Sequence, residues 1–360
     1  MEKEKLGLLV DIKTGKLNAN ASDENGKYPF FTCSKETLKI NRYSYDCECV
    51  LVAGNGDLNA KYYNGKFDAY QRTYILTNKN NKRLNLKYLY YFMQRYLEIL
   101  RTQSIGGVIK YIKLENLSDA EIKIVSLDEQ EKIINKLQKI ESIIDIRKQQ
   151  LEKLQILVKS QFVEMFGDIK NDNFRCVPIK KLVDTNISKV KKKYTSDDII
   201  KYIDISSIDN VKNEIIGYTK YNIGNEPSRA QQCLIKGDIL ISTVRPNLKN
   251  IAVNNFNDDN VVGSSGFCVL RPKGCKVDYL LEVLKSEKFT NDMVAVTTGS
   301  NYPAIHSTDI LNYEISVPPM ELQNKFADIV KQVDKQKFEI KRSLTEMEDL
   351  YNSLMNEYFG

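Results

Sequence analysis

Few residues of this sequence have the types and spacing that catalysis or metal binding requires. His306 is the sole histidine, which leaves almost no basis for histidine-dependent acid–base or metal chemistry. Cys47-Glu-Cys49 is the only close cysteine pair, and no second pair matches it. We therefore interpret both cysteines as half-buried strand residues rather than zinc ligands. The sequence predicts no metal site and no catalytic residues.

Motifs for nucleotide or methyl-group chemistry are also missing. The sequence has no G-x-x-x-x-G-K-[ST] phosphate loop. Val317-Pro-Pro-Met320 lacks both the first residue and the aromatic ring of the Asn/Asp-Pro-Pro-aromatic motif of amino-methyltransferases. Gly54-Asn-Gly56 lacks the third glycine of a dinucleotide-binding turn, and a hairpin explains it better. A self-sufficient nuclease or methyltransferase stays an alternative, which cofactor binding by the isolated chain would support.

The composition is ordinary for a globular protein with two domains. A chain of 360 residues is long enough for two hydrophobic cores. Its net charge of +6 fits contact with a polyanion, although many ordinary proteins are as basic. No segment approaches the ~18 apolar residues of a membrane span, and the apolar run 6–10 is too short for a secretory signal. We expect a cytoplasmic protein without a membrane partner.

An internal repeat organises the chain. Gly106 corresponds to Gly299, and the same offset of 193 residues then holds without a gap over some sixty positions. Chance identity would not keep one register over that length, so the chain contains a duplication. The matched positions include Ile112 and Ile305, Glu121-Ile122 and Glu314-Ile315, Gln130 and Gln323, and finally Phe166-Gly167 and Phe359-Gly360.

The end of each repeat has a heptad-like apolar stripe, which predicts a coiled coil of two long helices. We assign these spacer helices to residues 128–167 and 321–360. The pairing residues are expected to be Ile133, Leu137, Ile140, Ile144, Leu151, Leu154 and Val158 in the first helix, and Phe326, Val330, Val333, Ile340, Leu344, Met347, Tyr351 and Leu354 in the second.

Connectivity predicts that the two helices are antiparallel. Only a short polar stretch, residues 168–173, follows the first helix before the second domain begins. The second helix leaves that domain and can cover the first helix only by running back. We therefore expect a pseudo-two-fold, cyclic arrangement with one globular domain at each end of the helical pair.

The globular regions 1–127 and 168–320 are predicted to be similar α+β domains. Short apolar runs bounded by turn residues predict buried strands at 48–53, 73–76, 238–243 and 267–270. Helices are expected at 88–100 and 279–289. The polar loops 54–61 and 244–249 lie between predicted strands, which would hold them still.

Three segments of the second half form a distinctive set: Gly237-Asp-Ile-Leu-Ile-Ser-Thr-Val-Arg-Pro246, Thr298-Gly-Ser-Asn-Tyr302, and Val317-Pro-Pro-Met-Glu-Leu-Gln323, which opens a helix. Together with the repeat, they resemble the specificity (S) subunit of type I restriction–modification systems. The likeness covers essentially the whole chain, as two target-recognition domains each followed by a conserved helical region. The first copy departs at Val125-Ser-Leu-Asp-Glu-Gln130, which has no prolines, so we expect a less rigid helix entry there but the same helix.

The resemblance implies a non-catalytic subunit that reads a bipartite sequence in double-stranded DNA, one half-site per recognition domain. Such subunits hold two adenine-N6 methyltransferase (M) subunits, and restriction (R) subunits can join for cleavage. S-adenosylmethionine, ATP and Mg²⁺ would then belong to the partner subunits, and this chain would carry no cofactor. The helices would set the gap between half-sites, expected near one DNA turn of about 34 Å.

DNA contacts are predicted from polar residues in the loops of both domains. Base reading requires donors and acceptors at loop ends, and phosphate contact requires Lys, Arg or backbone N–H groups. The candidates are Asn55, Asn59, Lys61, Tyr62, Gln71, Arg72, Ser104 and Lys110 in the first domain, and Arg245, Asn247, Lys249, Ser264, Ser265, Ser300, Asn301 and Tyr302 in the second.

Less specific interpretations of these residues stay open. Each candidate can be a solvated turn residue, and Arg245 can belong to a structural pair. The basic run 188–193 is typical of a solvated loop, with phosphate contact as the alternative. A further alternative for the whole chain is a coiled-coil scaffold whose end domains bind protein instead of DNA.

Overall fold

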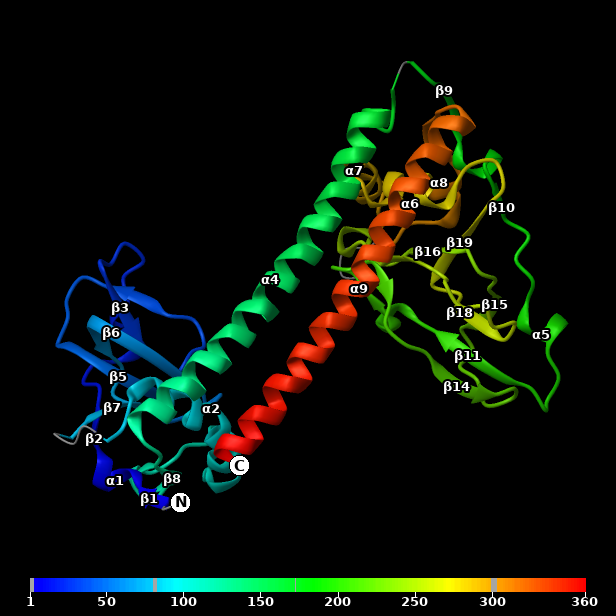
Figure 1. Ribbon diagram of the computed structural model, residues 1–360. Helices are drawn as coiled ribbons and strands as arrows, with labels where there is room; N and C mark the ends of the chain where they lie inside the picture. The colour runs from blue at the N-terminus through cyan, green and yellow to red at the C-terminus, as the bar shows by residue number, and fades with distance from the viewer. Residues whose placement is uncertain (1–2, 80–82, 172, 299–302) are drawn as a thin grey trace. The chain divides into compact units, whose positions relative to one another are not determined.

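The chain forms two compact units, which share two long helices. The computed structural model describes residues 3–79, 83–171, 173–298 and 303–360 (Figure 1). Unit 1 comprises Met1–Gln149 with Lys341–Gly360, and unit 2 comprises Gln150–Ile340. The helices α4 (Leu127–Phe166) and α9 (Met320–Phe359) each contribute one segment to each unit. Each unit therefore combines an α+β domain with a pair of helix segments.

A six-stranded sheet forms the domain of unit 1. Its strand order is β2-β7-β5-β6-β3-β4, and all neighbours are antiparallel except β3 and β6. The strands predicted at 48–53 and 73–76 are confirmed as parts of β5 and β7. The six strands are β2 (Val10–Thr14), β3 (Tyr28–Phe31), β4 (Leu38–Ile40), β5 (Tyr45–Ala53), β6 (Ala60–Ala69) and β7 (Thr73–Asn78).

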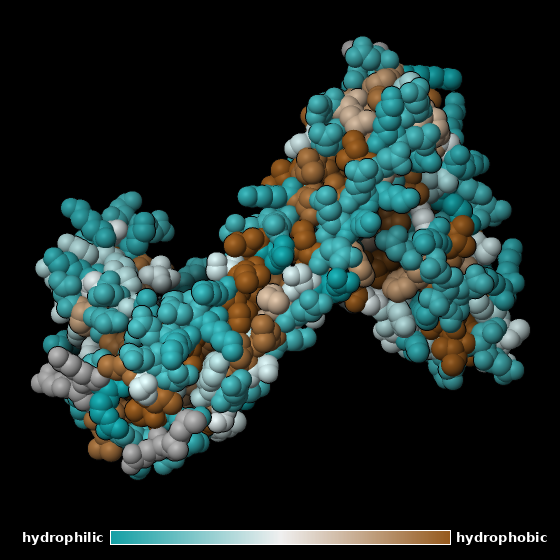
Figure 2. Space-filling view, viewed as in Figure 1, coloured by the Kyte–Doolittle hydropathy of each residue, from teal (hydrophilic) through white to brown (hydrophobic). Residues whose placement is uncertain are grey.

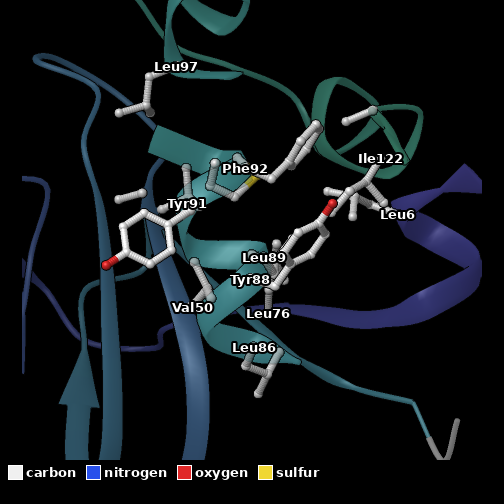
Figure 3. Close-up of a cluster of buried hydrophobic side chains, with 14 of the residues drawn as sticks. Leu6, Val50, Leu76, Leu86, Tyr88, Leu89, Tyr91, Phe92, Leu97 and Ile122 are labelled. Atoms are coloured by element: carbon white, nitrogen blue, oxygen red, sulfur yellow. The ribbon is translucent and has the colours of Figure 1, made fainter. Parts of the chain in front are cut away.

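Helix α2 (Leu86–Gln103) covers this sheet and confirms the predicted helix at 88–100. The helix begins where the Asn85 side chain accepts a hydrogen bond from the Lys87 N–H at 2.8 Å. Its buried face presents Tyr88, Leu89, Tyr91 and Phe92 to the core (Figure 3). Burial of each such side chain contributes about 1.5–3 kcal/mol. The remaining elements are β1 (Lys3–Lys5), α1 (Leu6–Leu9), η1 (Ala19–Ala21), α3 (Leu114–Ser118) and β8 (Glu121–Lys123).

Two four-stranded sheets form the domain of unit 2, with orders β10-β19-β16-β17 and β14-β11-β18-β15. The strands predicted at 238–243 and 267–270 are confirmed as β16 and β19. The sheet strands are β10 (Val183–Asp184), β11 (Ile199–Ile203), β14 (Thr219–Asn222), β15 (Ala230–Cys233), β16 (Ile239–Ser242), β17 (Ile251–Val253), β18 (Val261–Ser264) and β19 (Phe267–Pro272).

Shorter elements surround these sheets. A two-stranded pairing joins β9 to β20, just as β1 pairs with β8 in unit 1. The elements are β9 (Arg175–Pro178), η2 (Ile179–Lys181), α5 (Val190–Lys193), η3 (Ile205–Ser207), β12 (Ile208–Asp209), β13 (Glu214–Ile215), η4 (Pro246–Leu248), α8 (Ser307–Asn312) and β20 (Glu314–Val317).

The single helix predicted at 279–289 is wrong, because the structure has two helices there. Helix α6 (Val277–Lys285) ends at Ser286, whose backbone is extended with φ −64° and ψ 148°. The Ser286 hydroxyl then accepts a hydrogen bond from the Phe289 N–H at 3.2 Å and caps α7 (Glu287–Ala295). Serine at a helix N-terminus competes with helical continuation through this local bond.

In unit 1, the beginning of α4 packs against the end of α9 in antiparallel order. Hydrogen bonds link Lys136 to Tyr358 and Glu141 to Tyr351, and an ion pair links Lys148 to Glu348. Residue numbers therefore rise along α4 while they fall along α9. The buried or half-buried seam includes Ile133, Leu137, Ile140, Ile144, Leu344, Met347, Tyr351 and Leu354.

In unit 2, the end of α4 packs against the beginning of α9, which is the same antiparallel order. The rings of Phe162 and Phe166 lie 5.6 and 5.4 Å from the ring of Phe326. The predicted helices and their direction are confirmed within each unit. The core here includes the predicted Leu154, Val158, Phe326, Val330 and Val333, and the predicted Leu151 and Ile340 are half-buried.

Candidate nucleic-acid interface

A buried glutamine fixes each domain to the helix that follows it. In unit 1, the Gln130 amide donates to the carbonyl oxygens of Val125 (2.9 Å) and Arg83 (2.7 Å), and its oxygen accepts from the Asn85 N–H (2.8 Å). The side chain thus joins the helix entry to the start of α2. All three partners of Gln130 are backbone groups. The junction therefore forms in the first copy although this copy lacks the two prolines found at the helix entry of the second copy.

Gln323 makes the equivalent junction in unit 2. Its amide donates to the Pro318 carbonyl at 2.8 Å, and its oxygen accepts from the Lys276 N–H at 2.8 Å, just before α6. Pro318 and Val125 occupy the same repeat position. The repeat read from the sequence is therefore also a repeat of contacts.

In unit 1, a short hairpin over residues 105–111 lies against the loop that follows β5. The hairpin closes where Ile105 and Tyr111 exchange backbone hydrogen bonds of 3.0 and 2.9 Å. Tyr111 also forms a β-bridge with Asn55, and the Gly56 N–H donates to the Lys110 carbonyl at 2.9 Å. Two segments far apart in sequence thus form one exposed edge, which we call loop platform 1 (residues 54–61 and 105–111).

The same arrangement recurs in unit 2 after β16. Thr298 and Ala304 exchange backbone bonds of 2.9 and 3.0 Å, and Ala304 forms a β-bridge with Val244. The Arg245 N–H donates to the Pro303 carbonyl at 2.8 Å. Arg245 therefore matches Gly56, and both have positive φ, at 52° and 68°. We call this edge loop platform 2; its described residues are 243–249, 298 and 303–304.

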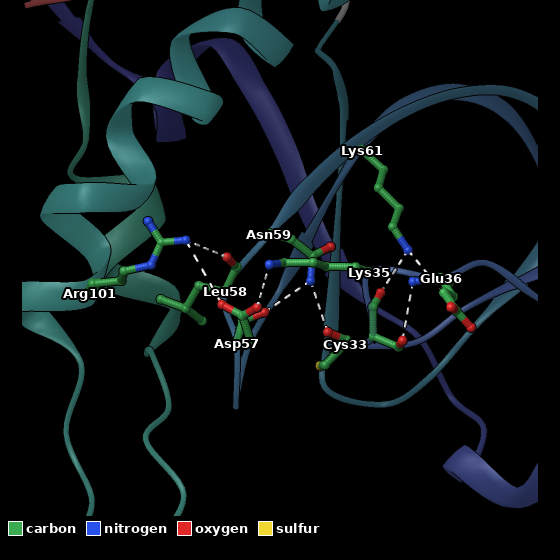
Figure 4. A network of polar contacts seen from close by, with 9 residues as sticks. Cys33, Lys35, Glu36, Asp57, Leu58, Asn59, Lys61 and Arg101 are labelled. Atoms are coloured by element: carbon green, nitrogen blue, oxygen red, sulfur yellow. Dashed lines mark hydrogen bonds and ion pairs between the residues drawn. The ribbon is translucent and has the colours of Figure 1, made fainter. Parts of the chain in front are cut away.

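Two of the candidates in loop platform 1 brace the backbone (Figure 4). The Asn59 amide donates to the Cys33 carbonyl at 2.8 Å and to the Asp57 carbonyl at 3.0 Å. The Lys61 ammonium donates to the Ser34 carbonyl at 2.8 Å. Burial lowers the pKa of Lys61 from its usual value. Both side chains hold the loop at 33–36 against the 57–61 turn, which gives them a structural role in the free chain.

The other candidates of the first domain divide by exposure. Tyr62 is half-buried and donates to the Glu48 carboxylate at 2.8 Å, and burial raises its pKa to about 12. It is therefore a neutral hydrogen-bond donor at physiological pH. Asn55 and Ser104 are half-buried, and the Ser104 hydroxyl donates to the Arg101 carbonyl at 2.7 Å. The fully exposed candidates are Gln71, Arg72 and Lys110.

In the second domain, the loop after β16 has an unusual backbone. Arg245 and Lys249 both have left-handed φ, 52° and 50°, on either side of η4, and strained backbone of this kind concentrates at functional sites. The Lys249 ammonium pairs with Glu287. Arg245, Asn247 and Ser265 are exposed.

Our sequence-based choice of Ser264 as a DNA-contact candidate was wrong. It is 3% exposed, and its hydroxyl accepts the Gly266 N–H at 3.2 Å inside the domain. Ser264 is therefore a structural residue of β18 and not a candidate for DNA contact. Ser300, Asn301 and Tyr302 lie outside the described residues. The basic run 188–193 ends in the one-turn helix α5, with its lysines exposed around the buried Val190.

Sequence reasoning missed Asn213, which supports loop platform 2, and Asp238, which holds the start of β16. The Asn213 amide donates to the Lys249 carbonyl at 3.0 Å, and Asn213 itself has φ of 55°. Asp238 is fully buried at the start of β16 and binds Arg271 through two 2.8 Å hydrogen bonds. Asp238 raises the pKa of Arg271. The Gly-Asp pair before β16 was a visible signal, but its arginine partner lies 33 residues away.

A second exposed surface lies on the two helices, outside the seams. Apolar residues are brown in Figure 2, and they reach the surface along the helical part of the chain. An apolar surface of this kind marks contact with another molecule more often than contact with water. We call these residues the helix surface: Ile143, Ile146, Ile156, Leu157 and Val163 of α4, and Phe338 and Leu350 of α9.

Two other kinds of site are absent from the described residues. Across residues 3–79, 83–171, 173–298 and 303–360, no three His, Cys, Asp or Glu side chains gather closely enough to hold a metal ion. Over the same residues, no helix combines the length and apolar character that a membrane crossing needs.

Comparison with known proteins points to one family. The model of the type I restriction modification DNA specificity domain matches residues 1–155 and 177–347. The chain is 25% identical to the type I restriction enzyme EcoDI specificity subunit of Escherichia coli, over 98% of this chain and 86% of that protein. It is 23% identical to the MjaVIII specificity subunit of Methanocaldococcus jannaschii, over 85% and 77%.

Two solved structures have the same fold. The S subunit of a type I restriction–modification system from M. genitalium superposes with a TM-score of 0.61 at 18% identity, covering 100% of this chain and 96% of that one. A chain from a structural study of complex assembly and conformational transition in a type I system gives 0.58 at 15% identity, covering 99% and 97%.

Proposed function

The chain belongs to the family of type I restriction–modification DNA specificity proteins, and we propose that each of its two loop platforms reads one half of a bipartite DNA target. The protein is a specificity subunit with two recognition domains, and such subunits are the non-catalytic recognition components of their complexes.

The observation that carries the proposal is the repetition of the loop platform. In each domain a pair of backbone-bonded residues, Ile105 with Tyr111 or Thr298 with Ala304, lies against the loop after a buried central strand through the same backbone bonds. The frame is alike in the two domains, whereas the side chains differ, with Gly56 at the position of Arg245. A constant frame with variable side chains suits two readers of different base sequences, because base edges are recognised by the type of donor and acceptor.

The helix surface supports a second part of the proposal, which is the docking of methyltransferase subunits. Its apolar residues belong to both units, with Ile146 in unit 1 and Ile156 and Phe338 in unit 2. By the repeat offset only Leu157 and Leu350 of these residues match, so the apolar side chains themselves are not duplicated. Because each unit carries part of the helix surface and the family resemblance implies two methyltransferase subunits, we propose that one of them binds the helices of each unit. Restriction subunits can join such a complex. S-adenosylmethionine, ATP and Mg²⁺ would be bound by these partners, and this chain would bind none of them.

The helices give the proposal its spacing element. Both α4 and α9 pass from one unit into the other, near residues 149–150 and 340–341. We propose that their length sets the gap between the half-sites. Since the DNA of the cell is the target, we propose that the protein acts in the cytoplasm.

The test is to sequence the methylated bases of a host with and without this gene. We expect one bipartite adenine-methylation motif to disappear when the gene is deleted. Replacing residues 174–320 with the matching domain of a relative should change one half-site and leave the other half-site and the gap unchanged. The purified chain should co-elute with methyltransferase subunits.

Two outcomes would contradict the proposal. A methylome that does not change on deletion, together with no DNA affinity of the assembled complex at any salt concentration, would favour a protein-binding scaffold. S-adenosylmethionine binding by the isolated chain would favour a self-sufficient enzyme.

A further inference from the structure

The tip of the hairpin at 105–111 is apolar and faces solvent. Val108 is fully exposed and Ile109 is 63% exposed, between Gly107 and Lys110. Two β-branched apolar side chains at the end of a surface loop are costly to leave in water, at about 25 cal/mol per Å² of apolar surface. Loop tips of this kind are normally polar, so the tip calls for a binding partner.

The hairpin is built to hold this tip in one place. Gly106 has φ of 115°, and a side chain at this position would approach the Ile109 carbonyl oxygen within 2.6 Å. Only glycine fits there, so the turn depends on this residue. Below the tip, Ile105 and Tyr111 close the hairpin with two backbone bonds. The exposed apolar pair therefore has a defined geometry.

Further bonds fix the base of the hairpin to the sheet. The Ile112 N–H donates to the Gly54 carbonyl at 2.9 Å, at the end of β5. The Tyr74 hydroxyl donates to the Ile112 carbonyl at 3.2 Å, from β7. The tip therefore projects from loop platform 1, beside Asn55 and Gly56, on a support provided by two central strands.

We propose that Val108 and Ile109 form an apolar wedge that enters a groove of the first half-site and opens one base step. Proteins that kink DNA insert apolar side chains between base pairs in this way, next to basic residues on the phosphates. Lys110, which is exposed and adjacent, is suited to the flanking phosphate. Duplex DNA is the partner because the tip is continuous with loop platform 1, so this inference rests on the proposed function.

The second copy lacks an apolar pair at this place. The repeat offset sets Asn301 and Tyr302 in the sequence against Val108 and Ile109. A polar amide and a phenol are suited to hydrogen bonds with base edges, whereas valine and isoleucine are not. Only the first domain therefore carries a wedge, and only the first half-site would be opened by it. Its specificity would come from the ease with which a base step opens, which is greatest at pyrimidine–purine steps.

The test uses the chain assembled with its methyltransferase subunits and a duplex that carries the methylated motif. The variant Val108→Ser/Ile109→Ser keeps Gly106 and the backbone bonds between Ile105 and Tyr111 but removes the apolar surface. We expect binding at least about 10-fold weaker than wild type. In duplexes with 2-aminopurine at successive positions of the first half-site, the wild-type complex should raise fluorescence at one step, and the variant should not.

A matched control removes the same kind of surface elsewhere in unit 1. Leu8 of α1 is 67% exposed, so Leu8→Ser loses a comparable apolar side chain away from the hairpin. It should bind and unstack DNA like wild type. A second variant, Val108→Asn/Ile109→Tyr, carries the residues of the other copy. It should fold with the wild-type Tm and still lose the 2-aminopurine signal.

The outcomes separate this inference from the proposed function. If wild type binds its motif and the serine variant binds equally well with the same fluorescence, the wedge is wrong while the specificity function stands. If the variant loses its methyltransferase subunits before DNA is added, the tip is a protein-docking element and the wedge is again wrong. If the wild-type complex itself shows no preference for the motif, the proposed function fails.

Discussion

The two units hold their helix pairs together with different chemistry, although both derive from one repeat. In unit 1, the Glu141 carboxylate of α4 accepts hydrogen bonds from Tyr91 of α2 at 2.6 Å and from Tyr351 of α9 at 3.0 Å. In unit 2, four aromatic rings pack together, those of Phe162, Phe166, Tyr279 and Phe326, with neighbouring centroids 5.0–5.6 Å apart. The seam of unit 1 adds these directed polar bonds to its apolar packing and keeps one close ring contact, Tyr88 with Phe359 at 4.9 Å, whereas the seam of unit 2 is centred on the aromatic cluster.

The repeat offset shows how this difference arose. The position of Glu141 is occupied by Asp334 in the second copy, and that of Tyr351 is occupied by Val158 in the first. The polar cluster therefore cannot form twice. A hydrogen-bonded cluster fixes one helix register because its geometry is directional, whereas an aromatic cluster gains its energy from buried area. The duplication thus preserves the helix pairing while the interactions that stabilise it diverge.

The largest expected effect comes from removing the aromatic ring at one repeat position, which is Phe166 in unit 2 and Phe359 in unit 1. Phe166 is 2% exposed and lies 5.0–5.4 Å from three rings, whereas Phe359 is half-buried, with the ring of Tyr88 at 4.9 Å and those of Phe92 and Tyr358 at 6.4 Å. Phe166→Ala should lower the free energy of unfolding of unit 2 by about 3–5 kcal/mol. Phe359→Ala should cost unit 1 about 1–2 kcal/mol, because less area is lost.

Hydrogen exchange measured peptide by peptide gives the stability of each unit separately, which a single melting curve does not. The control is Phe338→Ala on the exposed face of α9, which should change stability by less than about 0.5 kcal/mol. Equal losses for Phe166→Ala and Phe359→Ala would show that the two seams depend on aromatic packing alike.

A smaller effect is expected from the polar cluster of unit 1. Tyr351→Phe keeps the ring and removes one hydrogen bond to a partly buried carboxylate, so unit 1 should lose about 1–2 kcal/mol. Unit 2, whose equivalent position is Val158, should be unchanged. The readout is again hydrogen exchange at pH 7, and a loss below about 0.3 kcal/mol would mean that the bond to Tyr91 alone satisfies Glu141.

The same variant has a signature at alkaline pH. Burial, and then the nearby Glu141 carboxylate, raise the pKa of Tyr351 above its usual value. A raised folded-state pKa gives stability that is complete below the unfolded pKa of about 10 and is lost as the pH rises beyond it. Wild-type unit 1 should therefore weaken as the pH rises above about 10, and Tyr351→Phe should weaken less steeply over the same window.

The sequence predicted the features that depend on periodicity and repetition. The apolar stripe predicted both helices, the connectivity predicted their antiparallel order, and the 193-residue offset predicted the equivalence of Gln130 with Gln323. Periodicity selects apolar positions, however, so it passed over Glu141, whose tyrosine partners come from two other helices. Sequence also could not reveal the structural role of Asn59 and Lys61. They were chosen for their side-chain type, but the carbonyl groups they bind at 33–36 are brought to them by the sheet.

The pairing of hairpin and loop in each platform was only partly accessible from sequence. The offset aligned the two hairpins, because it holds from Gly106 onward. The loops after β5 and β16 match at a different offset, since Gly56 corresponds to Arg245, and only their shared backbone bonds reveal it. Insertions or deletions within the domains change the repeat offset from one segment to the next, while the backbone bonds between the paired segments are kept.

The smallest expected effect concerns Asp278. This acidic residue lies in the first turn of α6, at the repeat position that Lys87 occupies in unit 1. Asp278 lies near Asp334, the counterpart of Glu141. Burial, and then the charge of Asp334, raise the pKa of Asp278 above its ordinary value.

For a raised pKa, the stabilising contribution is complete below the unfolded pKa of about 3.9 and is lost as the pH rises. At pH 7 the ionised carboxylate therefore destabilises unit 2. Asp278→Asn should raise the free energy of unfolding of unit 2, measured by hydrogen exchange, by less than about 1 kcal/mol at pH 7, and the gain should shrink towards pH 4. A lower free energy of unfolding of unit 2 at pH 7 would instead show that the carboxylate is held favourably by the N-terminus of α6, and that repulsion from Asp334 is the weaker effect.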